Sequence, residues 1–251
     1  MTLSSRQGSG GNMKFIILST LLMVAGAVLF SVEQLKETDN LLYLMYLNSS
    51  YKSCLGTLIA PQWVLTAAQC FLPDLQIIFH GGSKNIQEFA GEILPYEKII
   101  IHPNFTATSP KNDLMLIKLS VYLSFFYNLE FQLPTLDTHE VSSCLIPTWI
   151  PNKEFKGNSE LLQHTIKTTR HPDANCTKLL GEKFLKGTFC MGFLLGNKEY
   201  CQEFKAAPAI CGDQLQGIMS WETGCSLMGY ITVFTDVYSH LPWINSIINT
   251  P

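Results

Sequence analysis

The sequence predicts an all-β protein, a barrel or a sandwich, closed by one C-terminal helix. Short apolar runs alternate with turn residues through most of the chain, and helical spacing of apolar residues appears only near the end. Each run is bounded by Gly, Pro, Asn or charged residues, which is typical of strands. The runs lie at residues 41–47, 56–59, 63–68, 75–79, 96–101, 114–119, 144–149, 188–194, 209–211, 216–221 and 230–234.

From Asp236 onward the apolar residues recur at helical intervals, which predicts an amphipathic helix over residues 237–249. Pro242 fits this helix best in its first turn, where the missing backbone N–H is least costly. The apolar positions are Val237, Leu241, Ile244 and Ile248.

Composition and charge restrict the function. The 251 residues are 47% hydrophobic and 15% charged, against a typical charged fraction of roughly 25%, so most of the chain folds around a sizeable core. The net charge is −3, Arg occurs only at Arg6 and Arg170, and the lysines are spread singly. A nucleic-acid or anionic-lipid surface needs a basic face, which this chain lacks. Small molecules, peptides or proteins remain as partners.

The N-terminus predicts secretion. Lys14 precedes an apolar run over residues 15–30 that contains small residues, as in a signal peptide. We expect cleavage between Ala27 and Ser31, so that residues 1–31 form an N-terminal extension and signal peptide. A membrane anchor is the weaker interpretation, because a spanning helix needs about 18 to 20 apolar residues and no stop-transfer flank follows. The expected location is extracellular.

The cysteines support an oxidising compartment. Eight cysteines, an even number, lie downstream of the leader, which in a secreted chain indicates disulfides. Their spacing does not determine which cysteines pair. No C-x-x-C pair occurs and no His stands at ligand spacing, so we expect no metal site and no cofactor. Asn48 and Asn104 begin glycosylation sequons; a third, at Asn175, has a cysteine in the middle. The cysteines are Cys54, Cys70, Cys144, Cys176, Cys190, Cys201, Cys211 and Cys225.

Several ordered motifs carry a resemblance to a known family. The segment Gly56–Cys70, GTLIAPQWVLTAAQC, is similar to the stretch around the catalytic histidine of trypsin-like serine proteases. Ordered motifs together are far more specific than one short motif. Within the family the chain resembles the inactive paralogues of the serine protease 58 type. The other matching segments are Ile101–Phe105, Asn112–Leu119, Cys201–Cys211 and Gln216–Trp221, with Trp243–Ile244 in the final helix.

The resemblance implies a domain over residues 32–251, built as two six-stranded antiparallel β-barrels with a cleft between them. The first barrel would span about 40–137 and the second about 138–236, followed by the helix at 237–249. The implied disulfides are Cys54–Cys70, Cys144–Cys211, Cys176–Cys190 and Cys201–Cys225.

The resemblance also implies a degenerate catalytic triad. Catalysis in this family needs a serine nucleophile, a histidine base and a carboxylate. Asp113 stands at the carboxylate position, but Gln69 stands at the base position and Lys205 at the nucleophile position. A carboxamide does not take up a proton near neutral pH, and acidic neighbours keep a lysine charged. We expect Lys205, Asp113 and Gln69 to form a hydrogen-bonded plug, with Glu203 competing for the ammonium.

Positions around the triad depart from the family as well. Glu203 replaces a glycine at the oxyanion position, where a carboxylate would repel developing negative charge. Phe204 replaces the aspartate that normally pairs with a newly released N-terminus, and no Ile-Val-Gly-Gly start is present. The resemblance implies that Glu199 stands where the family carries an aspartate at the floor of the specificity pocket, and that Glu222 and Thr232 stand at the positions of its two wall glycines.

Two functional hypotheses follow. The first is a secreted, monomeric pseudoprotease that is not an enzyme and acts by binding an unidentified protein partner, without nucleic acid, membrane anchor or cofactor. The second is a serine-type endopeptidase with weak or atypical activity.

Overall fold

The computed structural model describes residues 41–81, 91–109, 111–123, 130–136, 143–151, 161–193, 205–222 and 230–250. The chain divides into a unit of residues 1–33 and a unit of residues 34–251, and every described residue belongs to the second unit.

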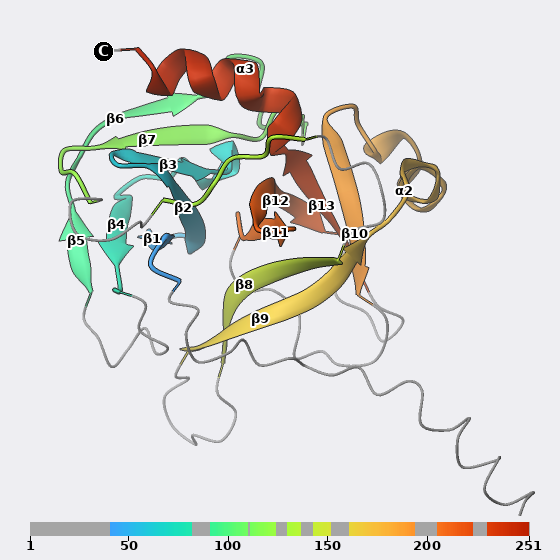
Figure 1. The fold of residues 1–251 in the computed structure, drawn as a ribbon, viewed down its shortest axis with the longest axis horizontal. Coiled ribbons are helices and arrows are strands. Elements are labelled where there is room, and N and C mark those ends of the chain that lie inside the picture. Colours follow the sequence, from blue (N-terminus) through green and yellow to red (C-terminus); the bar gives the residue numbers. More distant parts are fainter. Residues whose placement is uncertain are drawn as a thin grey trace, which may run out of the picture. The chain divides into compact units, whose positions relative to one another are not determined.

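The first half of this unit forms one antiparallel sheet with strand order β5-β4-β1-β2-β3-β7-β6 (Figure 1). The two end strands are neighbours in sequence, separated only by Pro95, so the sheet curls back on itself as a half barrel. No predicted apolar run covers β5, which was missed and makes seven strands where six were expected. The strands are β1 Leu44–Asn48, β2 Cys54–Ala60, β3 Trp63–Thr66, β4 Gln76–Phe79, β5 Glu92–Leu94, β6 Tyr96–Ile101 and β7 Met115–Leu119.

The second half forms a closed barrel with strand order β10-β13-β12-β11-β8-β9. Phe189 and Phe234 stack inside it with ring centroids 5.4 Å apart, and the buried Arg170 guanidinium lies 4.4 Å from the Phe189 ring. The strands are β8 Ser143–Pro151, β9 Leu161–Arg170, β10 Thr188–Phe193, β11 Pro208–Cys211, β12 Gln214–Glu222 and β13 Tyr230–Asp236.

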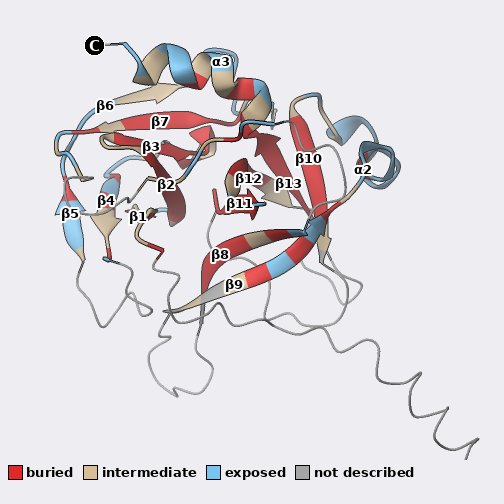
Figure 2. Ribbon diagram, in the orientation of Figure 1, coloured by how far each residue is buried: buried red, intermediate tan, exposed pale blue. Residues whose placement is uncertain are grey.

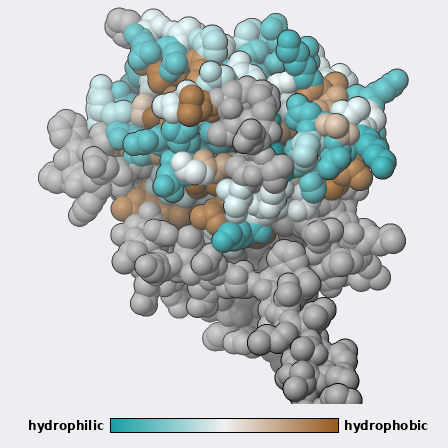
Figure 3. All heavy atoms as spheres, turned by 45° about the vertical axis from the view of Figure 1, so that its right-hand side comes forward, coloured by the Kyte–Doolittle hydropathy of each residue, from teal (hydrophilic) through white to brown (hydrophobic). Residues whose placement is uncertain are grey.

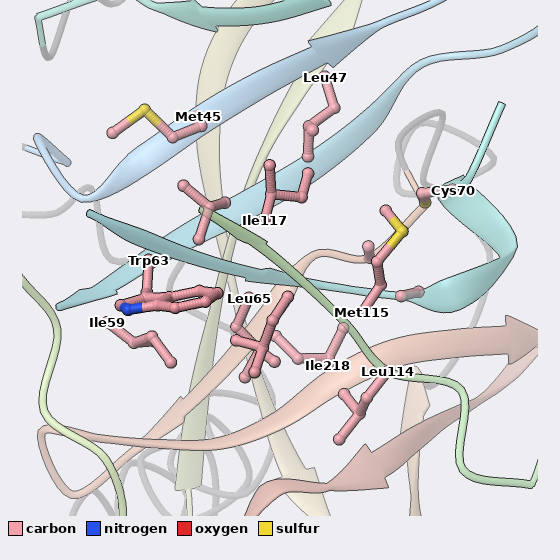
Figure 4. Packing of buried hydrophobic residues seen from close by; sticks show 14 of the residues in the cluster. Met45, Leu47, Ile59, Trp63, Leu65, Cys70, Leu114, Met115, Ile117 and Ile218 are labelled. Carbon is pink, nitrogen blue, oxygen red and sulfur yellow. The ribbon is translucent and has the colours of Figure 1, made fainter. Parts of the chain in front are cut away.

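The core of the first sheet is apolar and gathers residues from several strands, among them Met45, Leu65, Met115 and Ile117 (Figure 4). Ile218 of β12 belongs to the same cluster, so the two halves share part of their core. Most strands of both halves are buried, while β5, part of β6 and the outer faces of the helices are exposed (Figure 2).

Four helical segments complete the described chain: η1 Ala68–Cys70, α2 Asp173–Leu180, η2 Gly181–Lys183 and α3 Val237–Ile248. Helix α3 lies against the first sheet near β6 and β7 (Figure 1), and its Val237 and Ile244 enter that core. Asp236 caps it by accepting a hydrogen bond from the Ser239 backbone N–H at 3.1 Å. The helix begins at Val237, as expected, and Pro242 lies in its interior, so the prediction that Pro242 stands in the first turn was wrong.

The predicted fold class is confirmed: an all-β, trypsin-like arrangement with a C-terminal helix. The apolar runs correspond to strands within a few residues at each end. Strand β9 was missed, because its buried positions include Thr168 and Arg170, whose polarity hides the alternation. Helix α2 was missed too, since it lacks a strong apolar stripe.

Candidate functional site

Gln69 and Asp113 are brought together by the pairing of β3 with β7. Thr66 lies opposite Met115 in this ladder, so the residues just beyond the paired ends must be neighbours. The Gln69 backbone N–H donates to Asp113 Oδ1 at 2.9 Å, and Gln69 Nε2 donates to Asp113 Oδ2 at 2.8 Å. One residue thus supplies two donors to one carboxylate.

Ser220, from β12 of the second barrel, supplies a third donor. Its hydroxyl donates to Asp113 Oδ2 at 2.6 Å, and its carbonyl accepts from Gln69 Nε2. Asp113 is only 2% exposed. Burial raises the pKa of this carboxyl, and the hydrogen bonds from Ser220 and Gln69 act in the opposite direction. The group therefore works as a shared anchor between the two halves of the fold.

Lys205 lies beside this anchor but does not bond to it. Its carbonyl accepts from the Leu55 backbone N–H at 2.8 Å, which holds the residue against β2. Its ammonium pairs with Glu222 Oε1 at 3.1 Å, with the two side chains 28% and 22% exposed. The expected plug is thus only half right: Gln69 bonds to Asp113, while Lys205 turns to Glu222. Asp113 accepts from Gln69 and Ser220, and Glu222 at the end of β12 accepts from the Lys205 ammonium.

A second lysine, which the sequence analysis missed, lies in the same electrostatic field. Lys52 is half-buried, and its pKa is lowered overall. Burial is the main cause, the charge of Lys205 acts in the same direction, and Asp113 acts in the opposite direction. Lys52 stands two residues before Cys54, whose backbone forms a bridge with Lys205. The separation of only two residues between Lys52 and Cys54, in the predicted Cys54–Cys70 disulfide, was the sequence feature that could have placed Lys52 near the site.

A cleft of about 790 Å³ opens beside Gln69 and Asp113. One wall is the loop around residues 105–109, another is the end of α2 with η2, and the third is the end of β12. On the described part of the face in Figure 3, hydrophilic and hydrophobic residues intermingle. The lining residues are Gln69, Phe105, Ala107, Thr108, Ser109, Asp113, Leu179, Leu180, Glu182, Lys183, Leu185, Ser220, Trp221 and Glu222.

The remaining predicted positions divide into two groups. Thr232 lies opposite Glu222 in the β12–β13 ladder and is fully buried, so its side chain fills space inside the barrel. Glu199, Glu203 and Phe204 lie outside the described residues.

Three disulfides are present: Cys54–Cys70, Cys144–Cys211 and Cys176–Cys190. These are three of the four pairs that the resemblance implies. Cys201 and Cys225 lie outside the described residues, as does the leader.

Neither a metal site nor a membrane span is found in the described part of the chain. Among those residues, no group of three or more His, Cys, Asp or Glu side chains could hold a metal ion. Their helices are all too short or too polar to cross a bilayer.

Two curled antiparallel sheets meeting at a cleft, with a carboxylate shared between them, define the class of this protein. The trypsin family model matches residues 38–244, and the chain belongs to this family.

The relatives carry names of two kinds, serine protease 58 and trypsin. Human serine protease 58 is 35% identical over 249 residues, covering 94% of the chain and 99% of that relative. The bovine protein named probable inactive serine protease 58 is 35% identical over 243 residues, with the same coverage. A trypsin from Xenopus laevis is 30% identical over 250 residues, covering 95% of the chain and all of that relative.

Proposed function

We propose that this chain is a secreted, catalytically inactive member of the trypsin family that acts by binding a protein partner in its cleft. The observation that carries the proposal is the set of contacts around Asp113. Its carboxylate is occupied by Gln69 and Ser220, and the neighbouring ammonium of Lys205 is occupied by Glu222. Groups that would move protons in an active enzyme are instead bonded to one another.

Acyl transfer needs a nucleophile and a base that takes its proton. Gln69 has only an amide at the base position, and this amide donates both of its described side-chain hydrogen bonds. The Lys205 ammonium is engaged in an ion pair with Glu222 and does not contact Asp113. Neither residue can start the reaction.

The alternative, a weak or atypical endopeptidase, would need another nucleophile, and among the described serines Ser220 donates a hydrogen bond to Asp113. Its hydroxyl lies 2.6 Å from Asp113, close enough to give up a proton. However, the Ser220 side chain is only 1% exposed, and a carboxylate is a far weaker base toward a hydroxyl than an imidazole. We therefore favour binding without turnover.

The cleft has the size and composition of a binding groove. Pockets of roughly 300 to 1,000 Å³ are typical ligand sites, and this one lies within that range. Leu179 stands at its edge with 56% of its surface exposed, beside the charged Glu182 and Lys183. An apolar contact with polar neighbours suits an extended protein segment. Secretion is supported by the leader.

Site-specific photo-cross-linking tests this function. A photoreactive phenylalanine analogue is placed at Leu179, inside the cleft wall, and at Tyr122, which is 61% exposed and does not line the cleft. The secreted variants are irradiated in the fluid into which the source cells release the protein. We expect a discrete cross-linked protein from position 179 and none from position 122. Equal cross-linking at both positions, or turnover of a peptide library by the unmodified protein, would contradict the proposal.

A further inference from the structure

The structure separates the three glycosylation sequons by their surroundings. Asn104 lies in a tight turn, where the Phe105 backbone N–H donates to the His102 carbonyl at 2.9 Å. Both Asn104 and the sequon hydroxyl residue Thr106 are exposed. The residues that follow, Phe105 and Ala107 among them, line the cleft. A group attached to Asn104 would therefore stand at the cleft rim.

The backbone of Asn104 is anchored on both sides. Its N–H donates to His102 Nδ1 at 3.2 Å, and its carbonyl accepts from Asn112 Nδ2 at 3.1 Å. Asn112 Oδ1 in turn lies 3.2 Å from His240 Nε2, on helix α3. The Asn104 side-chain amide makes no hydrogen bond with any described residue. The turn is thus fixed to the fold while its amide points to solvent.

The other two sequons have different surroundings. Asn175 is on helix α2, and the middle residue of its sequon, Cys176, is fully buried in the disulfide with Cys190. The sequon hydroxyl, that of Thr177, donates to the Asp173 carbonyl at 2.9 Å. Asn48 is the last residue of β1 and is half-buried opposite Gln76. Only at Asn104 does the turn present the amide freely beside the cleft.

We propose that Asn104 carries an N-linked oligosaccharide that forms an additional wall of the cleft and restricts it to slender, extended partners. The proposal rests on the secretion included in the proposed function. In the transfer, the Asn104 amide nitrogen bonds to the anomeric carbon of a lipid-diphosphate-linked oligosaccharide. The bond from that carbon to the phosphate oxygen breaks, the lipid diphosphate leaves, and the amide loses one proton. Because Asn104 is exposed, a bulky polar group there costs no desolvation of the core.

The first arm of the test measures occupancy. The secreted protein is analysed by intact mass and by site mapping after glycosidase treatment that converts an occupied Asn to Asp. We expect Asn104 to be occupied, and the mass of one oligosaccharide to be lost in Asn104→Gln and Thr106→Ala. Thr106→Ser keeps the sequon and should keep the oligosaccharide, and Asn175→Gln should leave the mass of the attached sugar unchanged.

The second arm measures access to the cleft rim. Limited digestion with chymotrypsin can cut after Phe105, which lines the cleft, and after Tyr122, which does not. We expect enzymatic removal of the sugar from the folded protein to accelerate cleavage after Phe105 severalfold relative to cleavage after Tyr122. Asn104→Gln should match the deglycosylated protein.

The two possible failures are distinguishable. A secreted protein with an unmodified Asn104 would overturn this inference while leaving the proposed binding function in place. An occupied Asn104 whose removal leaves the ratio of the two cleavages unchanged would overturn the sugar's role as a wall. Retention of the protein inside the cell would instead contradict the secretion on which both rest.

Discussion

Replacing Gln69 by leucine tests whether this residue is a structural partner of Asp113. The change keeps approximate volume but removes the Nε2 donor to Asp113 and to the Ser220 carbonyl, while the Gln69 backbone N–H still reaches Asp113. Asp113 would remain buried with one donor fewer. We expect Gln69→Leu to destabilise the protein.

The magnitude follows from the groups involved. A hydrogen bond to a charged group contributes about 1.5 to 3 kcal/mol, and a neutral one about 0.5 to 1.5 kcal/mol. Gln69 is half-buried, so the low end of each range applies, giving a loss of about 2 kcal/mol. In an Asp113→Asn background the charged component is gone, and the same replacement should cost only about 1 kcal/mol.

The assay is urea unfolding at neutral pH of the parent, the two single variants and the double variant, with free energies compared as a cycle. We expect a coupling of about 1 kcal/mol between positions 69 and 113. Additive effects, with Gln69→Leu costing less than about 0.5 kcal/mol, would refute the assignment of Gln69 as a structural donor.

Three further predictions follow. A double-mutant cycle of Lys205→Met with Glu222→Gln should give a coupling free energy of unfolding of about 1 kcal/mol or less, because the ion pair is partly exposed. This coupling should decline with added salt, and a coupling that salt does not change would contradict the prediction. Burial and the neighbouring charge of His240 both lower the pKa of His102 in the folded protein. The stabilising contribution of neutral His102 is therefore present above about pH 6.5 and is lost as the pH falls through the folded-state pKa. Urea midpoints should therefore decline on acidification less steeply in His102→Asn than in the parent, and parallel curves would count against it. Restoring Gln69→His and Lys205→Ser together should leave cleavage of Arg and Lys peptides far below that of a trypsin control, because Glu222, which we expect at the position of a pocket-wall glycine, still lines the cleft. Trypsin-like turnover would show that the damage is confined to two residues.

Most strands could be predicted from the sequence because their signals, an apolar run bounded by turn residues, are local. The arrangement as two barrels came from the family resemblance that the ordered motifs carry. Strand β9 was not predicted because Thr168 and Arg170, although polar, are buried. A hydrophobic pattern assigns such residues to the exposed face. The start of α3 was predicted from its apolar spacing, whereas Pro242 was expected in the first turn and lies in the helix interior.

The site was predictable only in part. That Gln69 would contact Asp113 follows from the motifs that carry them. That Ser220 donates to Asp113 while Lys205 pairs with Glu222 depends on how β12 packs beside Asp113, and these segments are distant in sequence. The influence of Lys52 depended likewise on the packing of two segments against each other.

Labelling with a fluorophosphonate probe tests the central claim, the absence of catalysis, most directly. The purified mature protein, its Ser220→Ala variant and an active trypsin are treated alike, and labelled residues are mapped by mass spectrometry. We predict that trypsin is labelled and that this chain is not, in either form. Stoichiometric labelling of a serine in the parent, lost in Ser220→Ala or mapped to another serine, would contradict the account and support a serine-type peptidase.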